Sequence, residues 1–341
     1  MENGTEDIRV LSLGDFNDQE VRKLLAPIIY LAVLMTIGIP GNLIVMIIYR
    51  YKYSQSVYKT IIWNLALTDL LFCTITIPFN IGRLIHYYTF TELWVCKMFT
   101  TIIIVLILYS SHLLVTLSIH RFKQNCMPLR SQITPNNIQY WMIGGFCLAV
   151  VLDIPQGIMQ SLNQVKVTQN ITGHVCAVSY HFSIYSKIYN GFLTFLFSVY
   201  SFILFILYTL IGRKMYLKRQ RKHKRLHASS QADETSCKIT KIAVTVSAVF
   251  ALSYVPLFVI KLLVSVITQP ELSSTQFAIL KVCELSYVIN HVANPFIYAF
   301  HDRHFRKQFI MMISTAERRK SLTVTTEGIH SSIADFRTQF D

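Results

Sequence analysis

Charged residues are scarce in this chain: Asp, Glu, Lys and Arg make up only 15% of its 341 residues. An ordinary soluble domain contains about 25%. Hydrophobic residues account for 52% of the sequence, and the mean hydropathy is +0.43. This composition argues against an ordinary soluble domain and indicates a protein that lies largely within a lipid bilayer.

Signatures of common catalytic sites are also missing. The sequence has no HExxH zinc motif, no phosphate-binding Walker loop and no Gly-x-Ser-x-Gly nucleophile elbow. His301 and His304 have a spacing that suits metal ligands, but no third ligand is evident. Only Asp69 lies deep within a hydrophobic run, whereas a transporter or proton pump would need several such carboxylates. We therefore do not expect an enzyme, and a transporter is a weaker alternative.

Seven long hydrophobic runs dominate the chain. Each is close to or longer than the roughly 20 residues that a membrane-spanning helix requires. In the third run, the 25 steps from Cys96 to Arg121 span roughly 37 Å at about 1.5 Å each, which suits one tilted crossing. The runs cover residues 26–49, 60–82, 96–120, 139–160, 188–211, 240–266 and 276–299. We predict an all-α membrane protein built as a seven-transmembrane helix bundle.

The segments around the bundle complete the predicted organisation. Residues 1–25 form an acidic tail without a cleavable signal peptide, and residues 26–299 form the bundle. In residues 300–313, apolar and basic side chains interleave at helical spacing, which predicts a short amphipathic eighth helix on the inner membrane surface. Residues 314–341 are expected to form a disordered cytoplasmic tail.

The basic residues predict the orientation of the chain. With the N-terminus outside, the inner loops and tail hold 23 of the 32 Lys and Arg residues. The same side holds 7 acidic residues, so the excess positive charge faces anionic membrane lipids and a cytoplasmic partner rather than nucleic acid. The glycosylation sequons at Asn3 and Asn170 then lie outside. We predict a multi-pass plasma membrane protein with an extracellular N-terminus.

The cysteine count is odd, seven in all, which argues against a scaffold built from disulfides. In the predicted topology, only Cys96 and Cys176 lie at outer positions in loops. A bridge between them would tie the third helix to the second outer loop in an oxidising compartment. The alternative is two free thiols.

Almost every predicted helix contains one distinctive motif, and together these motifs resemble those of a known family. The motifs are Asn42, the run Asn64–Asp69, Cys96, Arg121, Trp141, Pro256 and Asn294-Pro295-x-x-Tyr298. Their order and spacing resemble those of rhodopsin-like (class A) G-protein-coupled receptors, such as neuropeptide receptors, over about residues 25–310. The resemblance implies a receptor that binds a ligand outside and activates a heterotrimeric G protein inside. It also implies switch and coupling roles for His120, Arg121, Phe122, Tyr208, Tyr254, Pro256, Asn294, Pro295 and Tyr298.

The resemblance further implies a sodium site, in which Asp69 is joined by the oxygens of Ser110, Asn290 and Asn294. Sodium is a hard cation, and hard cations take oxygen ligands. The alternative is a hydrogen-bonded polar core that holds water and no ion. His291, beside Asn290, departs from the family pattern in a way that could alter the site. We expect no cofactor apart from this sodium ion.

The surroundings of Arg121 depart most from the family pattern. Family members usually have an acid before this arginine and a tyrosine after it, but the triplet here is His120-Arg121-Phe122. A histidine cannot restrain the arginine through a salt bridge. The second usual acid, twenty residues before Pro256, is replaced by Ser236. We expect raised basal signalling; the alternative is that other polar groups hold Arg121.

Three tyrosines are assigned roles by the same resemblance. Tyr208 and Tyr298 are expected to move inward on activation and to meet around Arg121. Pro295 removes a backbone hydrogen bond just before Tyr298, which allows this helix to rearrange. Tyr254 replaces the usual tryptophan of the sixth helix, so the floor of the ligand pocket departs from the family pattern.

Two ligand classes are disfavoured. Amine receptors have an aspartate where this chain has Ile103, and opsins have a lysine where it has Val288. Mixed charges spread over several helices suit an extended ligand, so we favour a peptide. The alternative is a non-peptide small molecule, such as a lipid, but not a monoamine. The candidate ligand contacts are Arg83, Ile103, Gln156, Phe258, Lys261, Lys281, Glu284 and Tyr287.

Two further segments are expected to take part in function. In the second outer loop, residues 165–167 and 175–178 are expected to pair as a hairpin lid over the ligand. In the tail, Ser and Thr residues at 321–332 follow three basic residues, and their phosphorylation is expected to recruit arrestin.

Overall fold

The computed structural model describes residues 11–223, 231–266 and 273–314, without the side chains of residues 219, 221–223, 231–236 and 264–266. Six helical stretches in this part of the chain are long and apolar enough to cross a membrane. They are α2 (Leu25–Lys52), the continuous run of α3 (Val57–Leu71), η1 (Phe72–Thr76) and α4 (Ile77–Ile85), α5 (Leu93–Cys126), α6 (Ile138–Met159), α7 (Ser183–His223) and α8 (Gln231–Val266).

The seventh crossing consists of two shorter helices. α9 (Ser274–Glu284) and α10 (Val288–His301) have 11 and 14 residues, so neither alone is long enough to span a bilayer. A turn over residues 285–287 joins them. The single helix expected over residues 276–299 is therefore interrupted, although the chain still makes its seventh crossing there.

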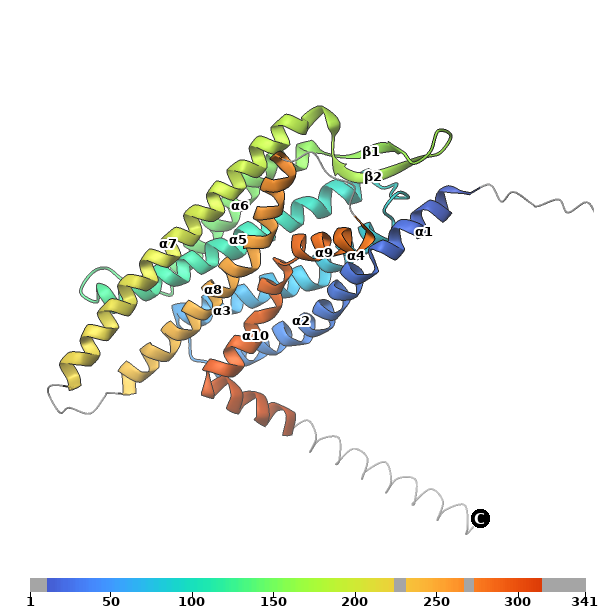
Figure 1. The fold of residues 1–341 in the computed structure, drawn as a ribbon. Helices are drawn as coiled ribbons and strands as arrows, with labels where there is room; N and C mark the ends of the chain where they lie inside the picture. Colours follow the sequence, from blue (N-terminus) through green and yellow to red (C-terminus); the bar gives the residue numbers. More distant parts are fainter. Residues whose placement is uncertain (1–10, 224–230, 267–272, 315–341) are drawn as a thin grey trace, which may run out of the picture.

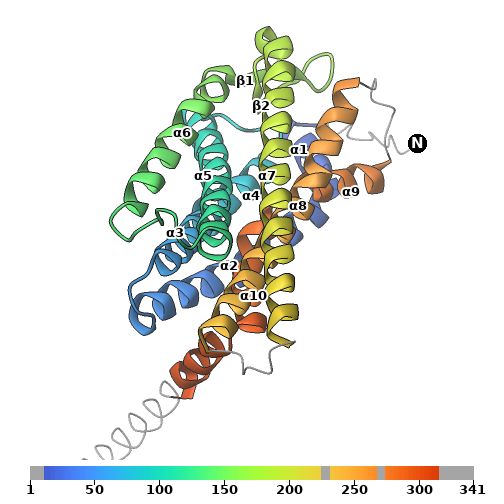
Figure 2. The same ribbon diagram turned by 90° about the vertical axis from the view of Figure 1, so that its left-hand side faces the viewer.

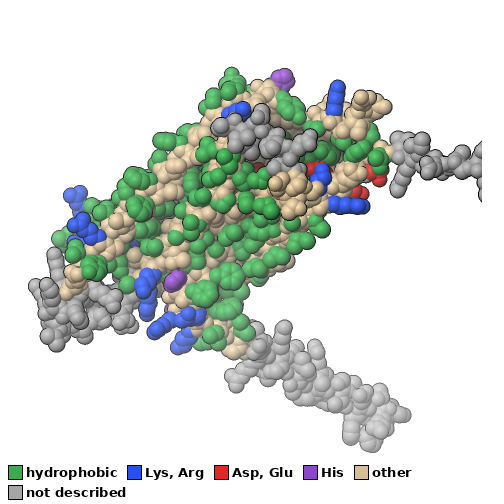
Figure 3. Space-filling view, viewed as in Figure 1, with side chains coloured by type: hydrophobic (Ala, Val, Ile, Leu, Met, Phe, Trp, Pro, Cys, Tyr) green, Lys and Arg blue, Asp and Glu red, His purple; other side chains and the backbone are tan. Residues whose placement is uncertain are grey.

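The helices pack side by side around α5 (Figures 1 and 2). α5 contacts α3, α6, α7 and α8, while α10 contacts α2 and α8. The surface is apolar as well as the core: Figure 3 shows hydrophobic side chains over much of one face, and Phe202 and Phe205 are 63% and 69% exposed. Such a surface is unfavourable in water and suits lipid. The predicted seven-helix membrane bundle is confirmed.

The second crossing changes its winding midway. η1 is a five-residue π-helix, and Pro78 follows it as the second residue of α4. Proline has no backbone N–H to donate to the preceding turn, and a π-turn accommodates the missing hydrogen bond. The change in winding thus begins before the proline itself.

One end of the bundle carries the hairpin of β1 (Gln160–Lys166) and β2 (Thr172–Val178), and we call it the hairpin end (Figure 1). The strands are antiparallel, with Leu162 opposite Cys176. A disulfide joins Cys176 to Cys96 near the start of α5, as predicted. The expected hairpin is therefore present, but its strands are longer and its register is centred on Asn163 rather than on residues 165–167.

A short helix of the N-terminal segment, α1 (Leu13–Lys23), also lies at the hairpin end. Ser12 and Asp15 form a capping box at its start. The side chain of Asn17 donates to the carbonyl of Ile85 at 2.9 Å and accepts from the N–H of Tyr88 at 3.0 Å. These bonds attach α1 to the loop between α4 and α5. Asn170 is exposed beside the hairpin turn, whereas Asn3 lies outside the described residues.

The opposite end of the bundle, which we call the tail end, carries a further helix over residues 303–314 (Figure 1). Asp302 interrupts the chain after α10 and accepts hydrogen bonds from the N–H groups of His304 and Phe305 at 2.9 and 3.2 Å. The same carboxylate accepts from the hydroxyl of Tyr53. Burial and this acceptor raise the pKa of Tyr53, so the phenol remains a donor. The eighth helix thus starts three residues later than predicted, because Asp302 caps it.

Candidate functional site

A group of charged side chains gathers at the hairpin end. The ammonium of Lys281 forms an ion pair with Glu284 at 2.8 Å. The carboxylate of Glu284 also interacts electrostatically with Arg83 and Lys261. Lys261 donates a 2.8 Å hydrogen bond to the neutral side chain of Asn190 on α7. Three cations from three helices therefore share one acid, and the group carries a net positive charge.

Apolar and aromatic side chains lie beneath this charged group. Phe258 packs on Phe197, with 4.6 Å between the ring centroids, and Tyr287 packs on Tyr254 at 6.0 Å. Ile103 is buried in the core, only 6% exposed. Between α5, α7 and α8 these layers leave a small cavity of about 50 Å³, which Phe258, Tyr254 and Lys261 help to line. The structure thus brings Arg83, Phe258, Lys261, Lys281, Glu284 and Tyr287 to one end of the bundle.

Gln156 is the remaining predicted contact. Its hydrogen bond goes to a residue outside this charged group. Its amide donates to Gln160 at 3.2 Å, and Gln160 lies against both sulfurs of the Cys96–Cys176 disulfide. Gln156 therefore connects α6 with the base of the hairpin.

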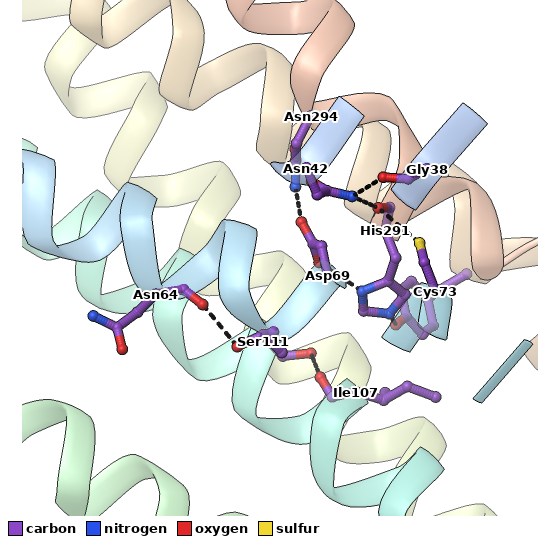
Figure 4. Close-up of polar contacts among 11 residues, drawn as sticks. Gly38, Asn42, Asn64, Asp69, Cys73, Ile107, Ser111, His291 and Asn294 are labelled. Atoms are coloured by element: carbon purple, nitrogen blue, oxygen red, sulfur yellow. Dashed lines mark hydrogen bonds and ion pairs between the residues drawn. The ribbon is translucent and has the colours of Figure 1, made fainter. Parts of the chain in front are cut away.

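A buried polar network surrounds Asp69 in the middle of the bundle (Figure 4). Asp69 is fully buried, and each of its carboxylate oxygens has a partner: Nδ1 of His291 at 2.7 Å and the amide of Asn294 at 2.6 Å. The ring of His291 stacks on Phe72 with 3.8 Å between centroids. The amide of Asn42 donates to the carbonyl of His291 at 2.8 Å. His291 therefore links α2, α3, η1 and α10 at one point.

Several oxygens beside this network have no hydrogen-bond partner among the described residues. They are Oγ of Ser110 and the amide oxygens of Asn42, Asn290 and Asn294, all of them buried. Buried polar groups are normally satisfied by protein, water or an ion. Of these residues, Asn294 bonds directly to Asp69 and Asn42 bonds to the carbonyl of His291, so at least these two oxygens lie in the network of the carboxylate. Unpaired buried oxygens together with a carboxylate are the donor set that a cation with oxygen ligands requires. His291 competes for the same carboxylate, so the departure seen in the sequence does enter the site.

Arg121 lies at the tail end of α5, only 3% exposed. Its guanidinium donates to Gln124 at 2.8 Å and lies over the ring of Tyr58, 4.6 Å from the centroid. His120 is also 3% exposed, and its Nδ1 has no partner among the described side chains. The side chain of Ser236 lies outside the described part of α8. Among the described residues, Arg121 is therefore held by a cation–π contact with Tyr58 and by the amide of Gln124, whereas the family pattern has an acid as the partner of this arginine.

The other predicted switch residues do not all meet at Arg121, and Tyr254 lies beneath the charged group at the hairpin end. The hydroxyl of Tyr208 accepts from Ser247 at 3.4 Å. Tyr298 packs on Tyr49, with 5.7 Å between centroids, and its hydroxyl has no partner in the described structure. Phe122 is half-buried, and Pro256 and Pro295 lie inside α8 and α10. Tyr49 and Tyr58, which the motifs did not single out, connect Tyr298 with Arg121.

An open cavity of about 930 Å³ lies at the tail end, beside Arg121. Its walls come from the α2–α3 turn, α5, α8 and the start of the helix 303–314. The charged and histidine side chains that line it are Lys52, His120, Arg121, Lys238, Asp302, Arg303 and His304. Because Asp302 is the one acid among these described residues and is bonded to Tyr53, the cavity favours an anionic partner surface.

A second buried acid accompanies Asp69 among the described residues of the bundle. Asp153 on α6 is also 0% exposed, six residues before the helix ends at Met159. It lies beside Thr101 on α5 and interacts electrostatically with Tyr189 on α7. The signal was present in the sequence, as a single acid within the fourth hydrophobic run. A carboxylate in such a position has a structural or functional partner more often than not.

The sequence has relatives along almost its full length. It is 26% identical to the type-1 angiotensin II receptor A of Xenopus laevis over 327 residues, which cover 91% of this chain and 86% of that receptor. It is 27% identical to the type-1 angiotensin II receptor B of the same species over 306 residues, 84% of this chain and 78% of the receptor.

The chain also matches the family described as "7 transmembrane receptor (rhodopsin family)" over residues 41–298. This match includes most of the sequence and nearly the whole bundle. Members of the family are signalling receptors, so the prediction that the protein is not an enzyme is confirmed. The seven crossings, the disulfide and this match together show that the chain belongs to the rhodopsin family of seven-transmembrane receptors.

Proposed function

We propose that this receptor lies in the plasma membrane with its N-terminus and hairpin end outside, binds a peptide there, and activates a heterotrimeric G protein at its tail end. The observation that carries the ligand class is the charged group of Arg83, Lys261, Lys281 and Glu284, which comes from three helices below a hairpin. Contacts spread over that width suit an extended ligand with several polar groups. The relatives, named for a peptide hormone, support the same class.

Ligand-dependent nucleotide exchange tests this function. Membranes of expressing cells are expected to bind more labelled GTPγS when a member of a synthetic peptide library is added, and membranes of untransfected cells are not. A lipid library, run in parallel, tests the alternative ligand class. A response to lipids and to no peptide would contradict the peptide assignment, while leaving the receptor class intact.

We also expect the ligand group that reaches Lys261 to be negatively charged. Glu284 is already in an ion pair with Lys281, whereas the hydrogen bond of Lys261 goes to the neutral side chain of Asn190 and its interaction with Glu284 is only a longer-range electrostatic one. For a peptide active in the exchange assay, Lys261→Gln is expected to weaken binding at least tenfold, because a charged hydrogen bond contributes about 1.5–3 kcal/mol. Glu284→Gln is expected to change the affinity by less than about threefold.

Competition binding with a labelled active peptide measures both variants. A tenfold loss in Glu284→Gln together with an unchanged Lys261→Gln would contradict this expectation. That result would instead assign a cationic ligand group to Glu284. Lys281→Gln serves as the matched control for loss of one cation in the group.

Sodium bound by Asp69, Ser110, Asn290 and Asn294 is a further part of the proposal, supported by the buried, unpaired oxygens of Ser110, Asn290 and Asn294 and by the bond of Asn294 to the carboxylate. Agonist affinity is expected to fall when sodium replaces a large organic cation at constant ionic strength. Asp69→Asn is expected to abolish this difference, because it removes the charge that holds the ion. His291→Ser is expected to enlarge it, because one carboxylate oxygen becomes available. A wild-type receptor that is indifferent to sodium would refute the site.

Tail phosphorylation with arrestin recruitment remains a prediction, since residues 315–341 lie outside the described structure. The G-protein contact is assigned to the tail-end cavity that contains Arg121. Its basic lining suits an acidic or carboxylate-bearing segment of the partner.

A further inference from the structure

A second hollow lies at the tail end. It shares only Lys238 and Arg303 with the cavity around Arg121. It is a groove of about 510 Å³ between α8, the end of α10 and the helix 303–314. The residues that line it are Lys238, Lys241, Phe300, His301, Arg303 and Arg306. Figure 3 shows Lys and Arg side chains gathered with a histidine where these elements meet.

The groove has an unusual charge composition. Four of its six lining residues are Lys or Arg, one is histidine, and none of these described residues is acidic. Asp302 is adjacent in sequence, but it lines the other cavity and is bonded to Tyr53 and to the start of the helix 303–314. The positive charges of the groove therefore have no carboxylate within its lining to neutralise them.

Two of the groove residues are held in place by the fold. The guanidinium of Arg306 donates to the carbonyls of Ala299 and Phe300 at 3.2 and 3.1 Å. The ring of His301 lies 3.3 Å from the hydroxyl of Thr245 on α8. These contacts fix the end of α10 against both the eighth helix and α8, so the cations of α8 and of the helix 303–314 converge on the end of α10 before any ligand arrives.

Apolar side chains next to the groove place it at a membrane surface. Phe300 is 76% exposed, and Phe296 and Ile310 are 48% and 64% exposed. Exposed aromatic and aliphatic groups of a receptor contact acyl chains, while Lys and Arg at the same level meet lipid headgroups. The groove therefore lies where a headgroup and its acyl chains can be contacted together.

We propose that this groove binds the headgroup of a polyphosphorylated inositol lipid of the inner leaflet. Four Lys and Arg side chains with a histidine match several phosphates, whereas a singly charged headgroup would leave most of them unpaired. The exposed apolar rim favours a lipid over a soluble inositol phosphate. The location in the inner leaflet rests on the proposed orientation; the binding itself does not. A bound headgroup would connect α8 with α10 and the eighth helix.

Binding of a fluorescent dioctanoyl phosphatidylinositol 4,5-bisphosphate to the purified full-length receptor, followed by anisotropy, tests the site. The variant Lys238→Gln/Lys241→Gln/Arg303→Gln is expected to bind at least tenfold more weakly than wild type. All three side chains are exposed, and melting temperature checks that the fold is kept. The matched control, Arg130→Gln/Arg213→Gln/Lys214→Gln, removes the same charge elsewhere at the tail end and is expected to bind within twofold of wild type.

Competitors distinguish the sources of the phosphate. Unlabelled lipid is expected to displace the probe at a concentration at least fivefold lower than free inositol trisphosphate, and dioctanoyl phosphatidylserine at matched total charge is expected to be weaker still. Equal weakening in both triple variants would overturn the proposal, because it would show a general charge effect. Lack of probe binding to wild type, or equal displacement by all competitors, would overturn it too. Since no agonist or G protein is present, these outcomes are independent of the exchange assay.

Discussion

Cys176→Ser is expected to reduce the receptor at the cell surface to below about a tenth of the wild-type amount and to abolish agonist binding by what remains. The Cys96–Cys176 bridge joins two residues that lie 80 positions apart in the sequence. A bridge of that separation stabilises a folded chain by about 4.5 kcal/mol when its effect is treated as lost chain entropy. The same bond holds β2 on α5 at the hairpin end of the bundle. Surface labelling and saturation binding measure the two effects.

Controls separate the bridge from cysteine chemistry in general. Cys283→Ser and Cys147→Ser remove free thiols, one half-buried and one exposed, and are expected to leave expression and binding within about twofold of wild type. The double variant Cys96→Ser/Cys176→Ser is expected to behave like the single one, because either change already opens the bridge. Normal surface expression of Cys176→Ser would contradict a stabilising role for the bond.

His120→Asp is expected to lower ligand-free GTPγS binding roughly tenfold. In the described structure Arg121 is held by the ring of Tyr58 and by Gln124, and the neighbouring His120 brings no negative charge. An aspartate at this buried position adds an anionic partner for the guanidinium, and such a bond contributes about 1.5–3 kcal/mol. His120→Asp therefore stabilises the conformation described here, in which Arg121 contacts Tyr58 and Gln124, relative to conformations in which Arg121 has lost these contacts. Nucleotide exchange in agonist-free membranes, normalised to receptor number, measures the effect.

Companion variants assign that effect to charge. His120→Asn matches the size of aspartate without its charge and is expected to keep wild-type basal output. Tyr58→Phe retains a ring for the cation and is expected to remain close to wild type, whereas Tyr58→Leu is expected to raise basal output. Equal basal output in His120→Asp and wild type would refute the weakened restraint. A Tyr58→Leu receptor with unchanged output would exclude the ring from holding Arg121.

The membrane-spanning helices could be predicted because bilayer thickness and backbone hydrogen bonding together fix their length and composition. The third run was expected over Cys96 to Arg121, and the helix extends from Leu93 to Cys126. The extension follows from the absence of Pro or Gly near either end of that run. The break at residues 285–287 could not be predicted in this way, since no proline or glycine marks it and packing between helices decides it.

For the candidate sites, sequence motifs could predict individual residues but not the contacts between them. Asp69 and Asn294 were expected together and do share a hydrogen bond. The pairing of His291 with the same carboxylate depends on the rotation of α10, which no periodicity reveals. Tyr58 was missed because an aromatic residue near a helix end resembles ordinary packing. The hairpin register was misjudged for a similar reason: valines favour strands but do not say which pairs face each other.

The divided seventh crossing has a consequence for how the protein is made. α9 carries Lys281 and Glu284, and α10 carries the buried polar side chains of Asn290, His291 and Asn294. A segment of this kind partitions poorly into lipid by itself, because each polar group carries a desolvation cost. His291 and Asn294 find their partner on α3, synthesised more than 200 residues earlier. Integration of the last span during biosynthesis therefore depends on helices that have already entered the membrane, and damage to α3 is expected to appear as a failure to insert α10.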